Sequence, residues 1–409
     1  MKRIAIAALA FALMMGVHAS SSPASGVATQ QWVARYNGPG NGWDHAAALA
    51  VDGSGNVYVT GNAYSASTNN DYTTVKYNSA GQQQWVKTYN GTGNGSDEAT
   101  ALALDGSGNV YVTGASYQGA STGIDYTMVR YGSDGTEWWV HAMDCSAHGQ
   151  DEALAVAVDG SDNSYFTGYC DNGGTNYDDY ATVKLDALGV SGWTRNYNSG
   201  AGNFDWGQDV AVDGSGNVYV TGLSNGDYTT LKYNSGGTQQ WVKTYNGTGN
   251  GGDSAKALAL DASGNVYVSG TSYGGGAVDD DYATVKYDSA GTEQWAIRYN
   301  NGSANGADTA VALAVDGSGN VYVTGTSYGG ASTNYDYATV KYSQAGAAGV
   351  GGIAELPDLA PGAAQPSDAP PEGSGWSGGT YAALAAGDAA AAHALAGAGW
   401  YARRRWLKA

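Results

Sequence analysis

The chain contains little of several residue types. Among its 409 residues are two Cys, three Phe and five Met, and Lys and Arg together number 18. The scarcity of Glu, Lys and Arg disfavours helices, while 64 Gly and 31 Tyr favour turns and strands. A chain of this length could hold two or three ordinary domains or one large all-β domain.

Recognisable catalytic signatures are also missing. The sequence has no nucleophile elbow, no phosphate-binding loop and no Ser/His/Asp arrangement in a familiar context. The region from His141 to Glu152 holds two His, an Asp pair and Cys145, but no spacing within it resembles a zinc signature. Whether the protein is an enzyme is left open by these patterns, and a non-enzyme is favoured.

Basic side chains are outnumbered in the body of the chain. Residues 29–346 carry 12 basic and 32 acidic side chains. A body this acidic repels nucleic acid and anionic lipid, so neither is expected as a partner. It suits an exported protein that meets cations or neutral polymers.

The two ends differ from the body. A charged start, an apolar run and a small-residue site predict a signal peptide over residues 1–19, with cleavage as late as residue 28 as the alternative. Residues 347–379 form a Gly/Ala/Pro/Ser linker. Residues 380–409 form an Ala-rich tail, in which 380–402 is either a membrane span stopped by Arg403–Arg405 or a basic tail. Asp388 interrupts this stretch. We expect an extracellular or cell-surface location, with possible membrane anchoring at the C-terminus.

One motif organises the body. The stretch VDGSGNVYVTG (Val51–Gly61) recurs in six copies about fifty residues apart, with its Asp at Asp52, Asp105, Asp159, Asp213, Asp261 and Asp316. Each copy contains four short runs rich in Val, Tyr, Thr and Trp, joined by Gly turns. Four strands at this period are typical of one propeller blade. We number the copies repeats one to six.

The repeats therefore predict an all-β, six-bladed β-propeller over residues 30–346. The chain begins with a fourth-type strand, Gln30–Tyr36, and its last repeat ends on a third-type strand, Asp336–Tyr342. We expect Gln31–Tyr36 to pair beside Ala338–Tyr342 and close the ring, because closure removes an exposed sheet edge. The recurring Trp of the fourth strand is expected to pack between blades rather than to form a ligand platform.

These motifs resemble a known family. The run DGSGNVYVTG, followed by DYATVKY and a Gly turn, resembles the bacterial beta-propeller repeat (SBBP) family over about residues 30–346. The resemblance implies an exported or surface protein, mostly without assigned activity. It also makes seven blades the alternative count. The C-terminal tail resembles a bacterial surface-anchoring signal.

Two sets of aspartates are expected on one face of the propeller. One begins each third strand, as at Asp71 and Asp125. The other precedes each motif Asp by eight residues: Asp44, Asp97, Asp151, Asp205, Asp253 and Asp308. Carboxylates in this number could coordinate a hard cation, most plausibly Ca²⁺. The favoured alternative is that each Asp accepts hydrogen bonds from backbone N–H groups of a turn.

Repeats three and four depart from the pattern. The loop between the second and third strands is shortest in repeat four, from Gly222 to Asp227, which predicts a notch beside repeat three. Repeat three holds both cysteines, Cys145 and Cys170, in loops on the same predicted face. A disulfide between them is expected in an oxidising compartment, with two free thiols as the alternative.

Three functions are compatible with these observations. The favoured one is a secreted or surface-attached, monomeric scaffold without catalysis, which binds a glycan, another polymer or a surface protein through its acidic loop face. The second is a structural spacer without a ligand. The third is a glycan hydrolase or lyase that uses Asp at the channel mouth.

Overall fold

The computed structural model describes residues 30–145, 149–171, 178–200, 203–275, 278–301, 306–330 and 334–344. The chain divides into two parts, 1–33 and 34–409, and all strands lie in the second. The predicted signal peptide, linker and C-terminal tail fall outside the described residues. Within the described ranges, no helix is long and apolar enough to cross a membrane.

The described residues form six antiparallel sheets, and each sheet takes its strands in chain order. The first three sheets contain β1 (His45–Val51), β2 (Val57–Ser65), β3 (Asn69–Tyr77), β4 (Gln83–Tyr89), β5 (Asp97–Leu104), β6 (Val110–Gly119), β7 (Gly123–Tyr131), β8 (Glu137–Met143), β9 (Glu152–Val158), β10 (Ser164–Cys170), β11 (Asp179–Leu185) and β12 (Ser191–Tyr197). The other three contain β13 (Asp205–Val212), β14 (Val218–Ser224), β15 (Asp227–Tyr233), β16 (Gln239–Tyr245), β17 (Ser254–Leu260), β18 (Val266–Gly275), β19 (Val278–Tyr287), β20 (Glu293–Tyr299), β21 (Thr309–Val315), β22 (Val321–Gly330) and β23 (Asn334–Tyr342). The prediction of four short strands per repeat is confirmed for five of the six sheets.

The motif Asp organises the first hairpin of each sheet. In repeat one, the Asp52 carboxylate accepts hydrogen bonds from the backbone N–H groups of Ser54 and Asn56, both at 2.9 Å. It also accepts one from the Asn56 side chain at 2.7 Å, while Gly55 takes a φ of 76° that a side chain would strain. Burial alone would raise the pKa of Asp52, but these hydrogen bonds outweigh it and lower the pKa. The recurring DGSGN stretch is therefore a turn held by its own carboxylate.

Aromatic side chains fill the space between consecutive sheets. Trp85 on β4 lies 6.1 Å from the ring of Tyr58 in its own sheet and 6.3 Å from Tyr131 in the next sheet. The same arrangement recurs with Trp193, which contacts Tyr165 and Tyr233. The prediction that the recurring Trp packs between sheets is confirmed by these contacts.

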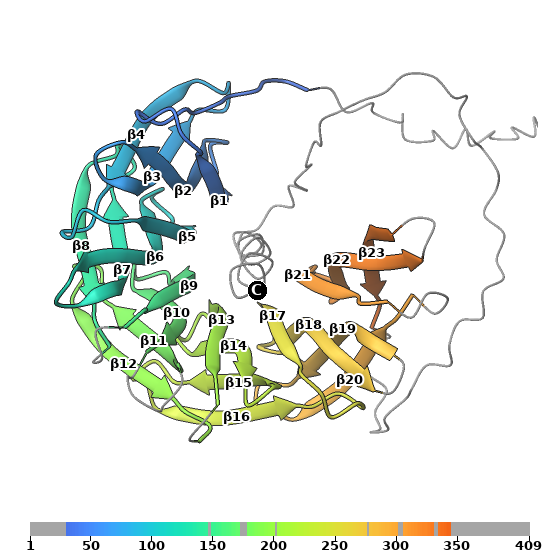
Figure 1. Cartoon of the computed structure of the whole chain (residues 1–409). Helices are drawn as coiled ribbons and strands as arrows, with labels where there is room; N and C mark the ends of the chain where they lie inside the picture. Colours follow the sequence, from blue (N-terminus) through green and yellow to red (C-terminus); the bar gives the residue numbers. More distant parts are fainter. Residues whose placement is uncertain are drawn as a thin grey trace, which may run out of the picture. The chain divides into compact units, whose positions relative to one another are not determined.

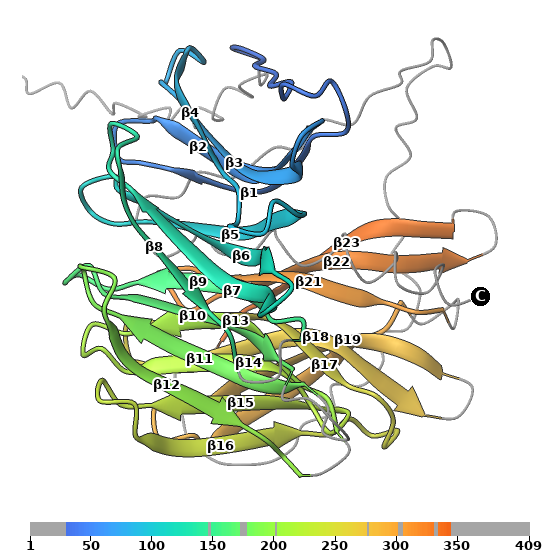
Figure 2. The ribbon, with the colours of Figure 1, turned by 60° about the vertical axis from the view of Figure 1, so that its left-hand side comes forward.

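Successive sheets also meet through their first strands. Strands β1, β5, β9, β13, β17 and β21 contact one another in consecutive pairs. Figure 1 shows these first strands on the same side of their sheets, with the fourth strands β4, β8, β12, β16 and β20 on the other. Figure 2 shows neighbouring sheets stacked face to face. Small Ala residues suit the crowded first strands, as at Ala99, Ala153, Ala255 and Ala310, which are all buried.

The sixth sheet differs from the other five, because it contains only β21, β22 and β23 among the described residues. Residues 30–44 form no strand, although the sequence predicts one over Gln30–Tyr36. A strand exists only where its backbone groups pair with a neighbouring strand, and residues 30–36 have no such pairing in the described sheets. Ring closure by this segment is therefore not observed and stays a prediction.

One inter-sheet contact carries a buried charge. Arg130 on β7 is 2% exposed, and its Nη2 lies 3.1 Å from the Asp105 carboxylate. The same Nη2 atom lies 3.3 Å from a second carboxylate, that of Asp162 in the next sheet. The guanidinium also donates a hydrogen bond to the carbonyl of Ala187. Its carbon centre stands 4.7 Å from the centroid of the Tyr111 ring. Asp105 thus stabilises its own turn and also binds Arg130. At the position of Arg130, the other described repeats carry a lysine.

We expect Asp105→Ala to destabilise the protein much more than Asp261→Ala. Both changes remove a turn carboxylate, which costs about 1 kcal/mol by analogy with a capping residue, but only the first leaves the Arg130 charge without its closest partner. Breaking one side of a buried ion pair costs about 3–5 kcal/mol. Denaturant unfolding of the two variants checks this, and equal losses of unfolding free energy would contradict the role assigned to Arg130.

Candidate functional site

The six predicted metal-ligating aspartates occupy equivalent places and make equivalent hydrogen bonds. Asp97 accepts one hydrogen bond from the N–H of Gly91 at 2.8 Å and another from Tyr117 at 2.8 Å. Each carboxylate therefore joins the loop before the first strand to the end of the second strand. The corresponding backbone donors are Gly38 and Tyr64 for Asp44, Cys145 and Asp171 for Asp151, Ser199 for Asp205, Gly247 and Tyr273 for Asp253, and Asn301 and Tyr328 for Asp308.

These contacts give the six aspartates the architectural role that the sequence favoured. Five of them are buried, with Asp44 of the first sheet as the partly exposed member. A buried carboxylate needs hydrogen-bond donors, and the loop N–H groups supply them. Calcium coordination by this set stays a prediction.

The second set of aspartates meets the first across the junctions between sheets. Burial raises the pKa of Asp97, and the negative charge of Asp71 from the preceding sheet adds to the rise. Burial likewise raises the pKa of Asp227, with a further contribution from Asp253. Carboxylates of the two sets are thus close enough across these junctions for one to raise the pKa of another.

The densest acidic group lies at the junction of the second and third sheets. One carboxylate oxygen from each of Asp125, Asp144 and Asp151 lies within 4.8 Å of the others. Burial raises the pKa of Asp151 to about 7, against the effect of hydrogen bonds from Cys145 and Asp171, and the charges of Asp144 and Asp125 raise it further. We call these three residues the acidic triad. It contains one of the six predicted ligands, and its oxygen atoms are of the kind that Ca²⁺ prefers.

A disulfide fixes the loop that carries the triad. Cys145 and Cys170 are bonded, with their Cα atoms 5.7 Å apart and a separation of 25 positions in the sequence. The bond joins the segment after β8 to the end of β10. Because the N–H of Cys145 also donates to Asp151, the disulfide and the acidic triad belong to one local structure.

An aromatic cluster lies beside the triad, at the junction of sheets three and four, and sequence reasoning missed it. Tyr169 and Trp206 have ring centroids 5.2 Å apart at an interplanar angle of 31°, and Phe204 meets Trp206 at 5.7 Å and 64°. The Trp206 Nε1 donates to Asp178 at 2.9 Å, and the Tyr169 hydroxyl donates to Glu152 at 2.7 Å. We call Tyr169, Phe204 and Trp206 the aromatic cluster.

A comparison of the repeats could have found the cluster. Trp206 directly follows Asp205, an aspartate that recurs in all six repeats. At the position of Trp206, the other repeats carry smaller or charged residues: His45, Glu98, Glu152, Ser254 and Thr309. The short loop predicted for repeat four also lies here: β14 and β15 pair up to Ser224 and Asp227 and leave a two-residue turn. The turn residues Asn225 and Gly226 both have positive φ, at 53° and 84°, as a tight hairpin requires.

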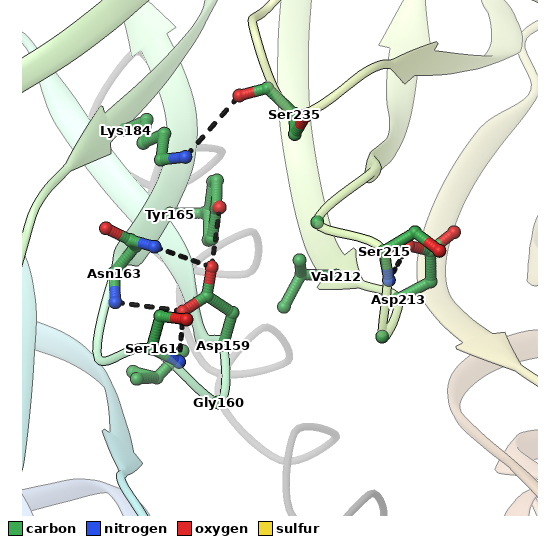
Figure 3. Close-up of a pocket in the computed structure, with 13 residues that line it drawn as sticks. Asp159, Gly160, Ser161, Asn163, Tyr165, Lys184, Val212, Asp213, Ser215 and Ser235 are labelled. Atoms are coloured by element: carbon green, nitrogen blue, oxygen red, sulfur yellow. Dashed lines mark hydrogen bonds between the residues drawn. The ribbon is translucent and has the colours of Figure 1, made fainter.

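A separate cavity of about 580 Å³ lies between the turns of sheets three and four (Figure 3). It is lined by the β9–β10 turn around Asp159, the β13–β14 turn around Asp213, and Lys184. Asp159 already accepts hydrogen bonds from Ser161, Asn163 and Tyr165, as Figure 3 shows. Since these polar groups satisfy one another within the repeat motif, the cavity walls offer little distinctive chemistry.

Residues 192–229 match the family model of the beta-propeller repeat, SBBP. The chain carries an SBBP beta-propeller repeat. No curated protein matches the chain.

Solved structures of low identity also align with the chain. A protein of unknown function from Bacteroides caccae is 13% identical, covers 66% of this chain and 83% of its own, and has a TM-score of 0.38. Sqt1 from Chaetomium thermophilum is 12% identical, with coverage of 69% and 67% and a TM-score of 0.45. At these scores the likenesses carry no argument about function.

One further carboxyl group departs from the repeat. Asp209 is buried on β13, where the corresponding residues of the other repeats are all alanine: Ala48, Ala101, Ala155, Ala257 and Ala312. Its oxygens accept hydrogen bonds from the N–H groups of Val210 and Leu258, both at 2.8 Å. Burial raises the pKa of Asp209 to about 7, and these two hydrogen bonds only partly oppose the rise.

We expect Asp209→Ala to flatten the pH dependence of stability. Because the folded-state pKa of Asp209 is raised above its unfolded value, folding favours the protonated form. The wild-type free energy of unfolding should therefore fall as pH rises from about 4 to about 7, by a few kcal/mol. Denaturant unfolding at several pH values checks this, with Glu293→Ala as the exposed control. An identical pH profile in wild type and Asp209→Ala would show that the carboxyl is not strained by burial.

Proposed function

We propose that this protein is an exported, non-catalytic β-propeller scaffold that binds a surface polymer through its acidic loop face, with glycans as the first class to consider. The observation that carries the proposal is that one junction on this face differs from the regular pattern of hydrogen-bonded carboxylates. Five of the six recurring carboxylates are held by two backbone N–H groups each, as Asp97 is. The junction of sheets three and four adds Tyr169 and Trp206, at positions where the other repeats have no Phe, Tyr or Trp.

The engagement of the carboxylates favours binding over catalysis. An acid or base must reach a substrate proton, but both oxygens of a residue such as Asp253 accept loop N–H groups and the residue is fully buried. Loops rich in Asn, Asp, Gly, Ser and Tyr offer adaptable hydrogen bonding and ring contacts to a polymer. The acidic triad is the place on this face where a cation such as Ca²⁺ would assist.

We expect the purified chain to be retained by one or more neutral glycans on an array, without release of products. If the acidic triad takes part, a chelator should weaken retention and added Ca²⁺ should restore it, with Asp288→Asn as a control for an acid outside the face. Product release would instead support a hydrolase or lyase. Absence of retention with and without Ca²⁺ would contradict the glycan proposal and leave a protein partner or a spacer role.

We further propose that the scaffold is a closed six-bladed ring, completed by Gln31–Tyr36 as the fourth strand of the last sheet. Tyr337 on β23 is 80% exposed, whereas its counterpart Tyr282 in the preceding sheet is fully buried. On the first sheet, Leu49 and Val51 are 40% and 54% exposed. Tyr337, Leu49 and Val51 are all more exposed than the residues at the same positions of the inner sheets, which a neighbouring sheet covers.

The segment before β1 supports the same proposal. The Tyr36 hydroxyl is close enough to Tyr77 to affect its pKa, which burial raises first and Tyr36 raises further. Tyr89 stands in the same relation to Tyr131 of the following sheet. This relation between Tyr36 and Tyr77 is the one that the proposal expects between a fourth-strand tyrosine and the next sheet.

A disulfide-trapping experiment can test the closure. The register of β19 with β20 pairs Thr284 with Ile297, which corresponds to Thr339 and Ala34 in the proposed sixth sheet. We expect the double variant Ala34→Cys/Thr339→Cys to form an intramolecular disulfide, detected by peptide mapping. The control Ala34→Cys/Val340→Cys places the second thiol on the opposite face of the strand and should not cross-link. Cross-links that form equally in both variants, or only between molecules, would overturn the proposed closure.

A further inference from the structure

The aromatic cluster combines features that a sugar ring requires. Phe204 is 46% exposed and meets the edge of Trp206, so an aromatic surface is presented beside the loops. Two carboxylates, Glu152 and Asp178, contact the cluster through hydrogen bonds from Tyr169 and Trp206. Pyranose rings present C–H groups on one face, which pack on aromatic rings, and hydroxyl groups at the edge, which donate to carboxylate oxygens.

We propose that the aromatic cluster, with Glu152 and Asp178 at its edge, binds one uncharged pyranose unit of a polysaccharide. This inference rests on the proposed function and assigns its binding residues and ligand class. Phe204 supplies the stacking surface, and Trp206 packs against it at a steep angle. The partly exposed Asp178 orients the sugar by accepting a hydrogen bond from one of its hydroxyl groups, while the buried Glu152 holds Tyr169 in place.

The rings of the cluster are held in place before a ligand arrives. The indole N–H of Trp206 donates to an ionisable carboxyl group, Asp178, and the buried Tyr169 hydroxyl donates to another, Glu152. Hydrogen bonds to charged acceptors are stronger than neutral ones. A surface whose side chains are already fixed loses less conformational entropy on binding, which favours affinity.

The surrounding charge selects against acidic sugars. Asp151 directly precedes Glu152, and with Asp125 and Asp144 it forms the acidic triad at the neighbouring junction. The whole chain has a formal net charge of −19. Uronates and sulfated sugars would be repelled by this field, whereas an uncharged pyranose meets no such penalty.

The short hairpin of repeat four lies next to the cluster. Trp206 pairs with Leu223, one residue before the end of β14, and the two-residue turn at Asn225 and Gly226 follows. In the next sheet, by contrast, the corresponding strands continue to Gly275 and Val278. A longer hairpin at this place would extend beyond the cluster, so its shortness keeps the aromatic surface accessible to a polymer.

We expect Phe204→Ala to weaken binding of a neutral oligosaccharide at least tenfold in calorimetric titration of the full chain. The probes are gluco-, xylo-, manno- and N-acetylglucosamine oligosaccharides, with an oligogalacturonate as the anionic probe. Trp43→Ala is the matched control, because Trp43 occupies the equivalent position of repeat one and is 89% exposed, but it precedes His45 rather than Trp206. This control should bind like the wild type.

The outcomes separate the inference from the proposed function. Wild-type binding that survives in Phe204→Ala would overturn the assignment of the cluster and leave the glycan-binding scaffold intact. Preference for the oligogalacturonate would overturn the ligand class. No binding of any probe would overturn both the assignment and the glycan proposal. Asp178→Asn, which keeps an acceptor for Trp206, provides a second folded variant and should weaken binding without altering thermal stability strongly.

Discussion

The tyrosine in the second strand of each repeat holds several parts of the structure together. Tyr58 packs its ring against Trp85 of the fourth strand and donates its hydroxyl to the turn carboxylate of Asp52 at 3.1 Å. The ammonium of Lys76 lies 4.9 Å from the same ring. One side chain thus links the first hairpin, the third strand and the fourth strand of a sheet. Because it is fully buried, its hydroxyl requires an acceptor, and the motif supplies the Asp six residues earlier.

This linkage explains why the repeat is conspicuous in the sequence. The Asp, the Gly of the turn, the Tyr and the Trp must occur together for the hairpin, the ring packing and the hydroxyl acceptor to be satisfied. The sheets, their strand order and the packing role of Trp could therefore be predicted from local patterns. Arg130 could not, since it replaces a lysine conservatively, and its two carboxylate partners come from different repeats.

The proposed ring closure and the residues of the candidate site are harder to predict from the sequence than the sheets are, and the reasons differ. Closure depends on pairing between the two ends of the body, which no local pattern specifies. The aspartates were recognised because they recur, yet recurrence reflects the need of each loop for a hydrogen-bond acceptor, as Asp97 illustrates. Trp206 was overlooked because it is a single departure from the repeat. In a repeat protein, the departures carry more information about function than the consensus does.

The departures in this chain converge on the start of one strand. Asp151 directly precedes β9 and Glu152 is its first residue. Asp151 belongs to the acidic triad, whereas Glu152 accepts a hydrogen bond from Tyr169 of the aromatic cluster. Burial, together with the charges of Asp144 and Asp125, raises the pKa of Asp151 to about 7, so its protonated form is favoured at this junction. The charge held at Asp151 therefore sets the electrostatic potential at Glu152 and hence at the edge of the aromatic surface. On the proposed function, the charge state of the acidic triad and sugar binding at the aromatic cluster would be coupled through two adjacent residues at the start of β9.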